Sequence, residues 1–335
     1  MPDYEVFELG DVVLQSGLTL RQAKLAYKTY GTLASSRDNV IVMPTFYGGQ
    51  HTDTEPMMRA GRALDLTRYF VVVPNMFGNG LSSSPSNTPA PFDRAAFPNV
   101  TLYDNVVCQH RLITEHLGIE RILLVVGYSM GAQQAYQWGA LYSDMVRAIA
   151  PLCGSARTSP HNHLFLEGVK AALLADGAFA DGWYQTPPIK GLRAFSRVYA
   201  GWLLSQDFFR EGEYRKMGLA SVEDTVRFFE GYFRQRDAND LLAMIWSWQH
   251  ADISANPQHK GDLAAALGAI RARAIVMPST TDLYFRVRDN ELEVAQMPNA
   301  ELRPIPSIWG HGAAFGVNSP DDEFIDAALR ELLAG

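Results

Sequence analysis

The sequence has little cysteine and no cluster of metal ligands. Its 335 residues include two cysteines, Cys108 and Cys153. One falls in a predicted helix and the other just past a predicted strand, and neither lies at a metal-type spacing. We therefore expect two buried, reduced core thiols. The pair His161 and His163 resembles half of a metal site, but no suitably spaced acidic or cysteine partner accompanies it, so no metal is predicted.

Long apolar runs and basic segments are also missing. No stretch approaches the roughly 18 apolar residues that would suggest a membrane span, and residues 1–17 lack a basic segment followed by an apolar run. The 29 basic and 36 acidic residues give a net charge of −7, which disfavours nucleic acid or an anionic membrane as a partner. A cytoplasmic protein acting on a small molecule is the expectation.

The composition, 47% hydrophobic and 19% charged, is sufficient for a large core. Short apolar runs bounded by turn residues predict buried strands at 40–43, 69–73, 122–126, 146–150, 274–277 and 301–305. Helical patterns separate several of them, the clearest at 103–117 with Gly118 as its stop, and a final helix is predicted at 321–333. Alternating strands and helices indicate an α/β fold with a mainly parallel sheet.

The alternation stops between 155 and 259. Helical stretches rich in aromatic residues are predicted at 195–204, 222–233 and 241–248, without a convincing strand. The sequence thus predicts a core domain, 1–154 and 260–335, with a helical lid, 155–259, inserted in it. Because ligands bind at the carboxyl ends of parallel strands, we expect the lid to cover those ends.

A nucleophile turn is the most informative local pattern. Gly127-Tyr128-Ser129-Met130-Gly131 lies between the predicted strand at 122–126 and a helix-like stretch at 132–141, the context of a nucleophile elbow. Little room is left for side chains two positions before and after such a serine, which explains the glycines. The pattern also occurs by chance in ordinary loops, and the strand-to-helix context favours the nucleophile.

A serine nucleophile needs a histidine base and an acid that orients it. Asp282 and His311 each follow a predicted late strand, and the order Ser129, Asp282, His311 is the one expected of an α/β-hydrolase fold. Asp282 could instead be a turn-former. Among the histidines, His311 alone follows the last strand in a glycine-rich loop, whereas His110 lies on a helix face.

An oxyanion needs two backbone donors. The N–H of Met130, at the start of the helix, is one candidate. Phe46, in the loop after the strand at 40–43, is the other, although Thr45 or Tyr47 could serve after a small shift in the loop. The glycine-rich loop at 75–80 lacks the spacing of a nucleotide-binding motif, so no cofactor is expected.

With these residues, the chain resembles the homoserine O-acetyltransferases of the α/β-hydrolase superfamily and the esterases that share their sequence type. The resemblance covers most of the chain and rests on segments 26–31, 65–70, 116–121, 128–134, 236–239, 262–267, 282–285 and 310–311. It supports the triad and implies acylation of Ser129 followed by release of the acyl group to an acceptor. Members of this family often dimerise through the lid, and the resemblance therefore implies that a homodimer is one state to expect.

Two positions depart from the transferase pattern. Transferases typically have an aspartate directly after the histidine to pair with the homoserine ammonium, and this chain has Gly312. The residue before the nucleophile, usually glycine, is Tyr128, which narrows the pocket or adds a hydroxyl. Arg197 lies close to where a lid arginine would hold the homoserine carboxylate, though it could equally be a surface residue. An ammonium buried without its carboxylate is costly, so homoserine selectivity should be lost.

These departures favour a serine ester hydrolase for small acyl esters. An acyl-CoA-dependent O-acetyltransferase with another hydroxylated acceptor is the alternative, and a non-catalytic protein on a hydrolase scaffold is a third. Tyr128, Tyr47 and Arg197 are the predicted substrate-binding residues. The aromatic lid residues suggest an apolar pocket, although most of them are expected to form lid core: Trp183, Tyr184, Phe195, Tyr199, Trp202, Trp246 and Trp248.

Overall fold

An eight-stranded sheet forms the centre of the computed structural model, which describes residues 2–334. The strand order is β1-β2-β4-β3-β5-β6-β7-β8. Strands β1 and β2 are antiparallel to their neighbours, and the pairs from β4 to β8 are parallel. The bounds are β1 Glu5–Val13, β2 Thr19–Tyr30, β3 Val40–Val42, β4 Phe70–Pro74, β5 Leu124–Tyr128, β6 Ala148–Leu152, β7 Arg273–Val276 and β8 Ala300–Leu302.

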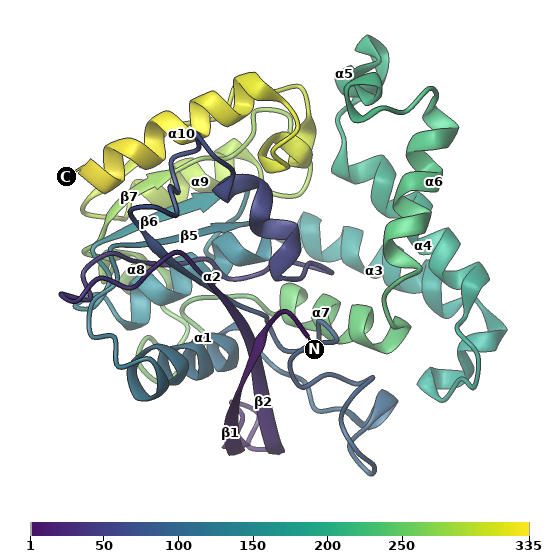
Figure 1. Cartoon of the computed structure of the whole chain (residues 1–335). Helices are drawn as coiled ribbons and strands as arrows, with labels where there is room; N and C mark the ends of the chain where they lie inside the picture. Colours follow the sequence, from purple (N-terminus) through teal and green to yellow (C-terminus); the bar gives the residue numbers. More distant parts are fainter. Residues whose placement is uncertain (1, 335) are drawn as a thin grey trace.

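Helices cover both faces of this sheet (Figure 1). Along β5 the side chains alternate: Val125 packs in a core cluster with residues of α1 and α2, whereas Leu124 and Val126 pack in a cluster with residues of α10. Period-two alternation with both faces apolar is what a strand buried between two helical layers requires. The bounds of these helices and of the two others of the core are α1 Leu102–Arg111, α2 Met130–Leu141, α8 Leu263–Gly268, α9 Val287–Val294 and α10 Ser319–Ala334.

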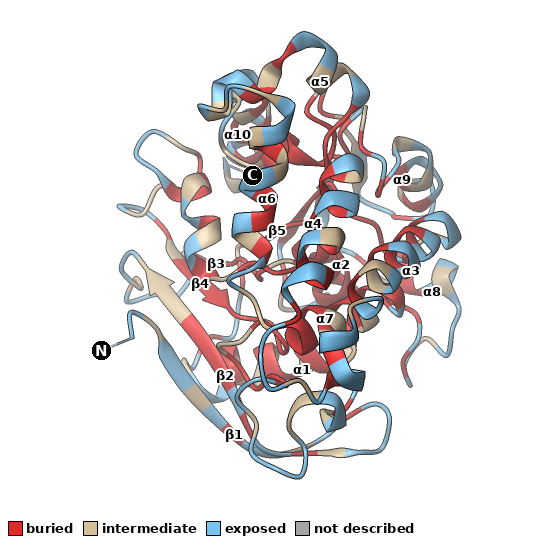
Figure 2. Ribbon diagram, turned by 90° about the vertical axis from the view of Figure 1, so that its right-hand side faces the viewer, coloured by how far each residue is buried: buried red, intermediate tan, exposed pale blue. Residues whose placement is uncertain are grey.

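A group of helices lies between β6 and β7 in the chain and beside the sheet in space (Figure 1). Its members are α3 Pro160–Leu174, α4 Ile189–Leu203, α5 Gln206–Glu211, α6 Val222–Phe233 and α7 Ala238–Gln249. Buried residues line their inner surfaces (Figure 2). These residues share one apolar cluster with Tyr47 and Met130, which follow β3 and β5. The helical group therefore packs directly on the loops at the carboxyl ends of these strands.

The predicted α/β fold with a mainly parallel sheet is confirmed. Each predicted strand overlaps one of β3 to β8, and the helix predicted at 222–233 coincides with α6. The helix predicted at 103–117 divides into α1 and a π-helical turn, Leu112–His116, before Gly118 at φ 62°. The strand predicted at 301–305 ends early, at Leu302, two residues before Pro304, which has no N–H to donate.

The hairpin formed by β1 and β2 is a feature that the apolar runs did not predict. Most residues of β1 are at least partly exposed, and the pairing of the two strands shifts register around Gly10. An edge strand exposed to water has no need of a continuous apolar run. The hairpin therefore lacks the signal by which the inner strands were found.

Candidate active site

Ser129 lies on the turn between β5 and α2. Its backbone has φ 57° and ψ −124°, a conformation that L residues rarely adopt and that persists only where the surrounding structure enforces it. A Cβ on Gly127 would lie 2.1 Å from the carbonyl oxygen of Gly131, and a Cβ on Gly131 would lie 2.6 Å from that of Pro44. The positions two before and two after the serine must therefore be glycine, because a side chain at either would clash with backbone.

Three buried side chains meet at this turn from three strand ends. His311 Nε2 lies 2.9 Å from Ser129 Oγ, and His311 Nδ1 lies 2.6 Å from Asp282 Oδ2. Ser129 follows β5, Asp282 follows β7, and His311 follows β8 on the short 3₁₀ helix η6 (Gly310–Ala314). Their exposed fractions are 2%, 5% and 1%. The structure thus brings together the serine, acid and histidine named from the sequence, and water has little access to the bonds between them.

The carboxylate of Asp282 is held by its own loop. Its Oδ1 accepts hydrogen bonds from the backbone N–H groups of Tyr284, at 2.7 Å, and Phe285, at 3.2 Å. This leaves Oδ2 directed at the imidazole. Two fixed acceptor bonds orient the carboxylate, and the carboxylate in turn orients the histidine, as a base–orienter pair requires.

Tyr128 contacts the histidine rather than offering its hydroxyl to the cavity. Its phenolic oxygen donates to the carbonyl oxygen of His311 at 2.8 Å, and its ring centroid lies 4.8 Å from that of the imidazole. Burial raises the pKa of this phenol well above its usual value. The ring lines the cavity, while the hydroxyl is already bonded.

Two loops meet where the predicted oxyanion donors lie. Gln134 of α2 donates from Nε2 to the carbonyl oxygen of Thr45 at 2.9 Å, which ties the loop after β3 to the helix after Ser129. The N–H of Thr45 itself donates to Pro74, so Thr45 is not a free donor. Within residues 2–334, the N–H groups of Phe46 and Met130 donate to no other residue. Met130 is the first residue of α2, where no intrahelical acceptor is available.

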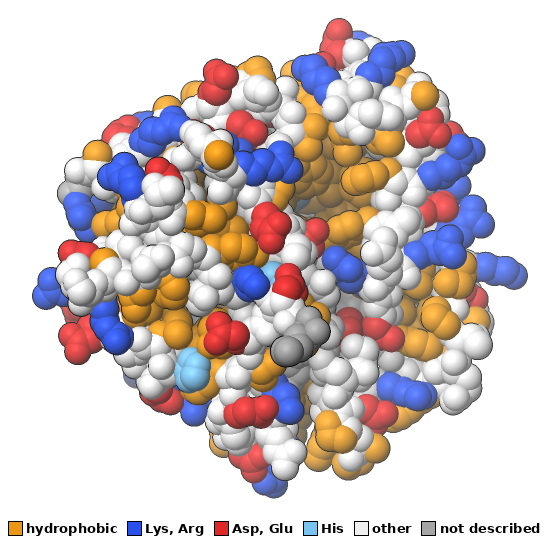
Figure 3. Space-filling view, viewed as in Figure 1, with side chains coloured by type: hydrophobic (Ala, Val, Ile, Leu, Met, Phe, Trp, Pro, Cys, Tyr) orange, Lys and Arg blue, Asp and Glu red, His pale blue; other side chains and the backbone are white. Residues whose placement is uncertain are grey.

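An apolar cavity of about 300 Å³ opens onto Ser129 and His311. The hollow is visible on the face shown in Figure 3, with hydrophobic side chains gathered in it. Tyr47 is part of its wall, and its hydroxyl donates to the Leu241 carbonyl at 3.3 Å. The aromatic lining consists of Phe46, Tyr47, Tyr128, Tyr199, Phe228, Phe229, Tyr232, Phe233 and Phe315.

Sequence reasoning named four of these nine aromatic residues, Phe46, Tyr47, Tyr128 and Tyr199. Of the aromatic lid residues named above, Tyr199 lines the cavity, whereas Phe195 and Trp248 are buried in the helical cluster and Trp183 is 48% exposed. The aromatic side chains of α6 were missed although they recur at helical spacing, at 228, 229, 232 and 233. The spacing of aromatic residues shows that one face of a helix is aromatic, but it does not show which part of the protein that face packs against.

The structure does not bring Arg197 to the cavity. Its Nε lies 2.8 Å from Glu230 Oε1 and its Nη2 lies 3.4 Å from Glu223 Oε1, with the side chain 44% exposed. Both carboxylates belong to α6 and Arg197 to α4, so the guanidinium links two lid helices. The expectation that Arg197 holds a substrate carboxylate is corrected accordingly, because its charge is directed to these two acids.

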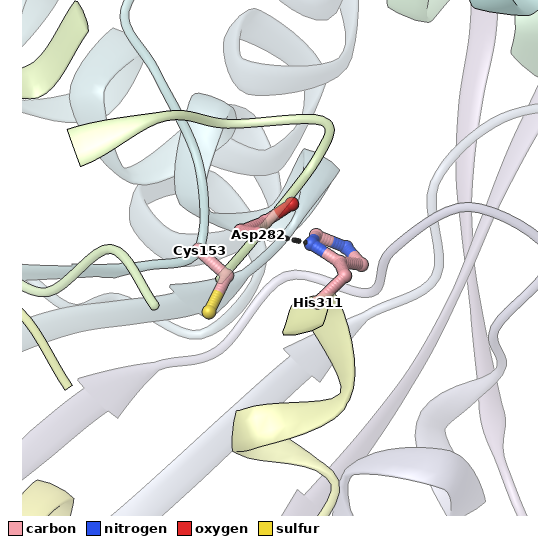
Figure 4. A group of neighbouring side chains, drawn as sticks. All are labelled: Cys153, Asp282 and His311. Carbon is pink, nitrogen blue, oxygen red and sulfur yellow. Dashed lines mark hydrogen bonds and ion pairs between the residues drawn. The ribbon is translucent and has the colours of Figure 1, made fainter. Parts of the chain in front are cut away.

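Cys153 lies beside the acid and the histidine (Figure 4). One ligand atom from each of Cys153, Asp282 and His311 lies within 4.8 Å of the others, and all three residues are buried. Burial raises the pKa of the thiol well above its usual value, which keeps it protonated. His311 Nδ1 and Asp282 Oδ2 are already bonded to each other at 2.6 Å, so a metal ion bound through these two atoms would have to break that bond.

In the part of the chain that the structure describes, no helix combines the length and the apolar character needed to cross a bilayer.

Comparison with known proteins places this geometry in a family. The chain is 40% identical to an ethyl acetate hydrolase of Pseudomonas veronii over 337 residues, which covers 99% of this chain and 95% of that protein. It is 30% identical to a homoserine O-acetyltransferase of Gluconobacter oxydans, with coverage of 96% and 90%.

A solved structure and a family model agree with these relatives. The crystal structure of an acetylester hydrolase from Corynebacterium glutamicum superposes with a TM-score of 0.96 at 38% identity, with 99% of this chain and 96% of that chain covered. The alpha/beta hydrolase fold model matches residues 38–312. The chain therefore belongs to the alpha/beta hydrolase fold family, and esterases are among its similar relatives, at higher identity than the homoserine acetyltransferase named here.

Proposed function

We propose that the protein is a serine ester hydrolase for small, acetyl-type esters. One observation carries this proposal: a continuous hydrogen-bonded chain runs from Asp282 through His311 to Ser129 and ends on the wall of an apolar cavity. The similarity to an ethyl acetate hydrolase and an acetylester hydrolase supports the substrate class.

Acylation begins at Ser129. His311 Nε2 accepts the hydroxyl proton as Ser129 Oγ attacks the ester carbonyl carbon, and Asp282 stabilises the imidazolium that forms. The tetrahedral intermediate collapses with cleavage of the bond to the alcohol oxygen. The alcohol leaves with the proton from His311, and the acyl group remains on Ser129.

Deacylation repeats these steps with water. His311 takes a proton from a water molecule, whose oxygen attacks the acyl carbon, and the carboxylic acid leaves as Ser129 Oγ regains a proton. In both steps the N–H groups of Met130 and Phe46 would stabilise the oxyanion. Their lack of other acceptors within residues 2–334 supports this assignment.

The cavity favours neutral esters with short chains. Besides His311, Asp53 is the acidic or basic side chain in the wall that the structure describes, and no lysine or arginine lines it. A substrate carboxylate would find no counter-charge there, and burial of an unpaired charge is costly. The volume of about 300 Å³ accommodates a small acyl group together with a small alcohol.

Two observations argue against homoserine as acceptor. Arg197 is paired with Glu230 and Glu223 and does not line the cavity. A Cβ on Gly312 would lie 3.2 Å from both Leu204 Cδ2 and Phe315 Cδ2. The environment of position 312 is therefore apolar and leaves little room for a carboxylate that would receive an ammonium.

The helical insertion supplies much of the cavity wall. Tyr199 and Leu203 come from α4, Met217 from the turn that follows α5, and several aromatic side chains from α6. This supports the division into a core, 1–154 and 260–335, and a lid, 155–259, with the lid shaping the substrate pocket. The homodimer remains a prediction, which a measurement of the molecular mass in solution would test.

An acyl-CoA-dependent O-acyltransferase for an acceptor other than homoserine is the second candidate. The similarity to a homoserine O-acetyltransferase over nearly the whole chain favours it. Under this function acetyl-CoA would acylate Ser129 rapidly, and the acyl-enzyme would persist until a suitable alcohol was added.

Turnover of p-nitrophenyl acetate and ethyl acetate by the purified chain tests the proposal. Wild type should hydrolyse both, and Ser129→Ala should lose about 10³-fold or more in kcat. Ser36→Ala, an exposed serine far from β5 in the chain, is the matched control and should retain wild-type rates. Product from acetyl-CoA and homoserine, with neither ester turned over, would overturn the proposal.

A further inference from the structure

We propose that Tyr128 is a positioning residue that holds His311 in register with Ser129. This inference rests on the ester hydrolysis proposed above and assigns a role to a residue that the triad does not include. Tyr128 is the last residue of β5 and directly precedes Ser129. Its hydroxyl donates to the backbone carbonyl of His311 at 2.8 Å. The nucleophile and the base are thereby linked by a path that does not pass through Asp282.

His311 needs an anchor for its backbone as well as for its ring. Asp282 holds the ring at Nδ1. The backbone lies on η6, a short turn that begins at Gly310 with φ 61°. The N–H of Gly310 donates to Thr281 Oγ1 at 3.0 Å, which anchors the segment before the histidine. The bond from Tyr128 anchors the carbonyl of the histidine itself.

Packing prevents the phenol from turning away. The Tyr128 ring meets the rings of Phe46 and Phe315 edge to face, with centroids 5.1 and 5.9 Å away, and it lies against His311. The side chain is 5% exposed. Because three rings hold the Tyr128 side chain, its hydroxyl can point in one direction only. The hydroxyl therefore fixes the position of the His311 carbonyl, to which it donates.

A base that moves by a fraction of an ångström loses alignment with the serine hydroxyl. A misplacement of about 1 Å costs on the order of 100-fold in rate. Removal of one of several anchors should cost less, about tenfold, and the loss should fall on kcat because substrate binding does not use this bond. A wall residue with a merely steric role would instead change KM.

Tyr128→Phe is the test, since it removes the hydroxyl and keeps the ring. We expect kcat for p-nitrophenyl acetate to fall about tenfold with KM within about twofold. Labelling of Ser129 by a fluorophosphonate should slow by the same factor. Tyr27→Phe is the comparison variant, because its buried hydroxyl also donates a hydrogen bond, to Glu5 Oε2 at 3.1 Å, and the residue lies on β2 outside the cavity wall. It should lower the thermal midpoint, as Tyr128→Phe does, and leave kcat near the wild-type value.

A double-mutant cycle with Asp282→Asn separates positioning from general destabilisation. If both residues act by placing His311, their effects on kcat should be less than multiplicative. Wild-type kcat in Tyr128→Phe, or a loss confined to KM, would overturn the inference. Fluorophosphonate labelling needs no ester turnover. If the wild-type protein hydrolyses no ester but Tyr128→Phe still slows the labelling, the proposed function is contradicted and the positioning role of Tyr128 is supported.

Discussion

At the scale of single residues, two positions that depart from the transferase pattern lie in one group of contacts. Tyr128 donates to the carbonyl of His311, and Gly312 is the next residue along the chain. Phe315 contacts the Tyr128 ring and occupies the space beside Gly312. A change at either position therefore alters the same group of rings around the histidine, so substitutions at the two should not behave independently.

Replacing the acid tests the triad at this scale. Asp282→Asn keeps the size of the side chain but can present an amide N–H to His311 Nδ1 and so favour the wrong tautomer. We expect kcat to fall by about 10³ to 10⁴-fold with a small change in KM, by analogy with the serine protease triad. Steady-state kinetics with p-nitrophenyl acetate measure this. A decrease of less than tenfold would exclude Asp282 as the orienting acid.

At the scale of elements, the turn between β5 and α2 sets the backbone conformation of Ser129. Gly127→Ala places a Cβ 2.1 Å from a backbone carbonyl oxygen that cannot move without distorting α2. We expect a loss of more than about 3 kcal/mol in unfolding free energy, or no folded protein. Gly168→Ala, in α3 with no atom within 4 Å of the new Cβ, should instead gain about 0.5 to 1 kcal/mol. Urea denaturation compares the two, and equal stability would contradict the steric account.

Helix α6 should control which esters enter. Phe228 lines the cavity yet is 46% exposed, so it lies at the cavity's edge. Phe228→Ala should leave the unfolding free energy within about 1 kcal/mol, since little packing is lost. The reduced apolar contact should raise KM for ethyl and butyl acetate severalfold while kcat stays near wild type. A kinetic series of acetate esters measures this, with Val222→Ala, exposed on the same helix and outside the cavity wall, as the control.

At the scale of the whole molecule, a buried carboxyl group outside the cavity wall should affect stability. Glu293 of α9 is 6% exposed and accepts from the N–H of Ala156 at 2.8 Å and from Asn290 at 2.7 Å. Burial raises its pKa from 4.5 to about 7. Between these values the folded state binds more protons than the unfolded state, so the stability from this group is present below pH 4.5 and is lost as the pH rises to about 7.

Glu293→Gln tests this linkage. The loss between those two pH values is on the order of 3 kcal/mol in wild type, and the uncharged amide should make the unfolding free energy less dependent on pH in the same interval. Urea denaturation at several pH values between 4.5 and 8 gives both slopes. Parallel slopes for the two proteins would show that folding does not raise the pKa of Glu293.

Local patterns accounted for most of the fold and for the three residues that meet at the turn. Buried strands and amphipathic helices leave short-range signals, and Ser129, Asp282 and His311 could be named because each follows such a strand. The β1–β2 hairpin left no such signal because much of it faces water. Arg197 was misplaced because its sequence position gives the helix on which it lies but not the direction of its side chain or its partners, Glu223 and Glu230.

The sequence by itself determined the order of the elements, the elbow glycines and which serine, acid and histidine follow the strand ends, since these depend on neighbours along the chain. Only the tertiary structure decided that Tyr128 bonds to the His311 carbonyl and that α6 forms a cavity wall. It also decided that Gly312 lies among apolar side chains. These features depend on which distant segments pack together and how their side chains are directed, and no short stretch of sequence encodes that.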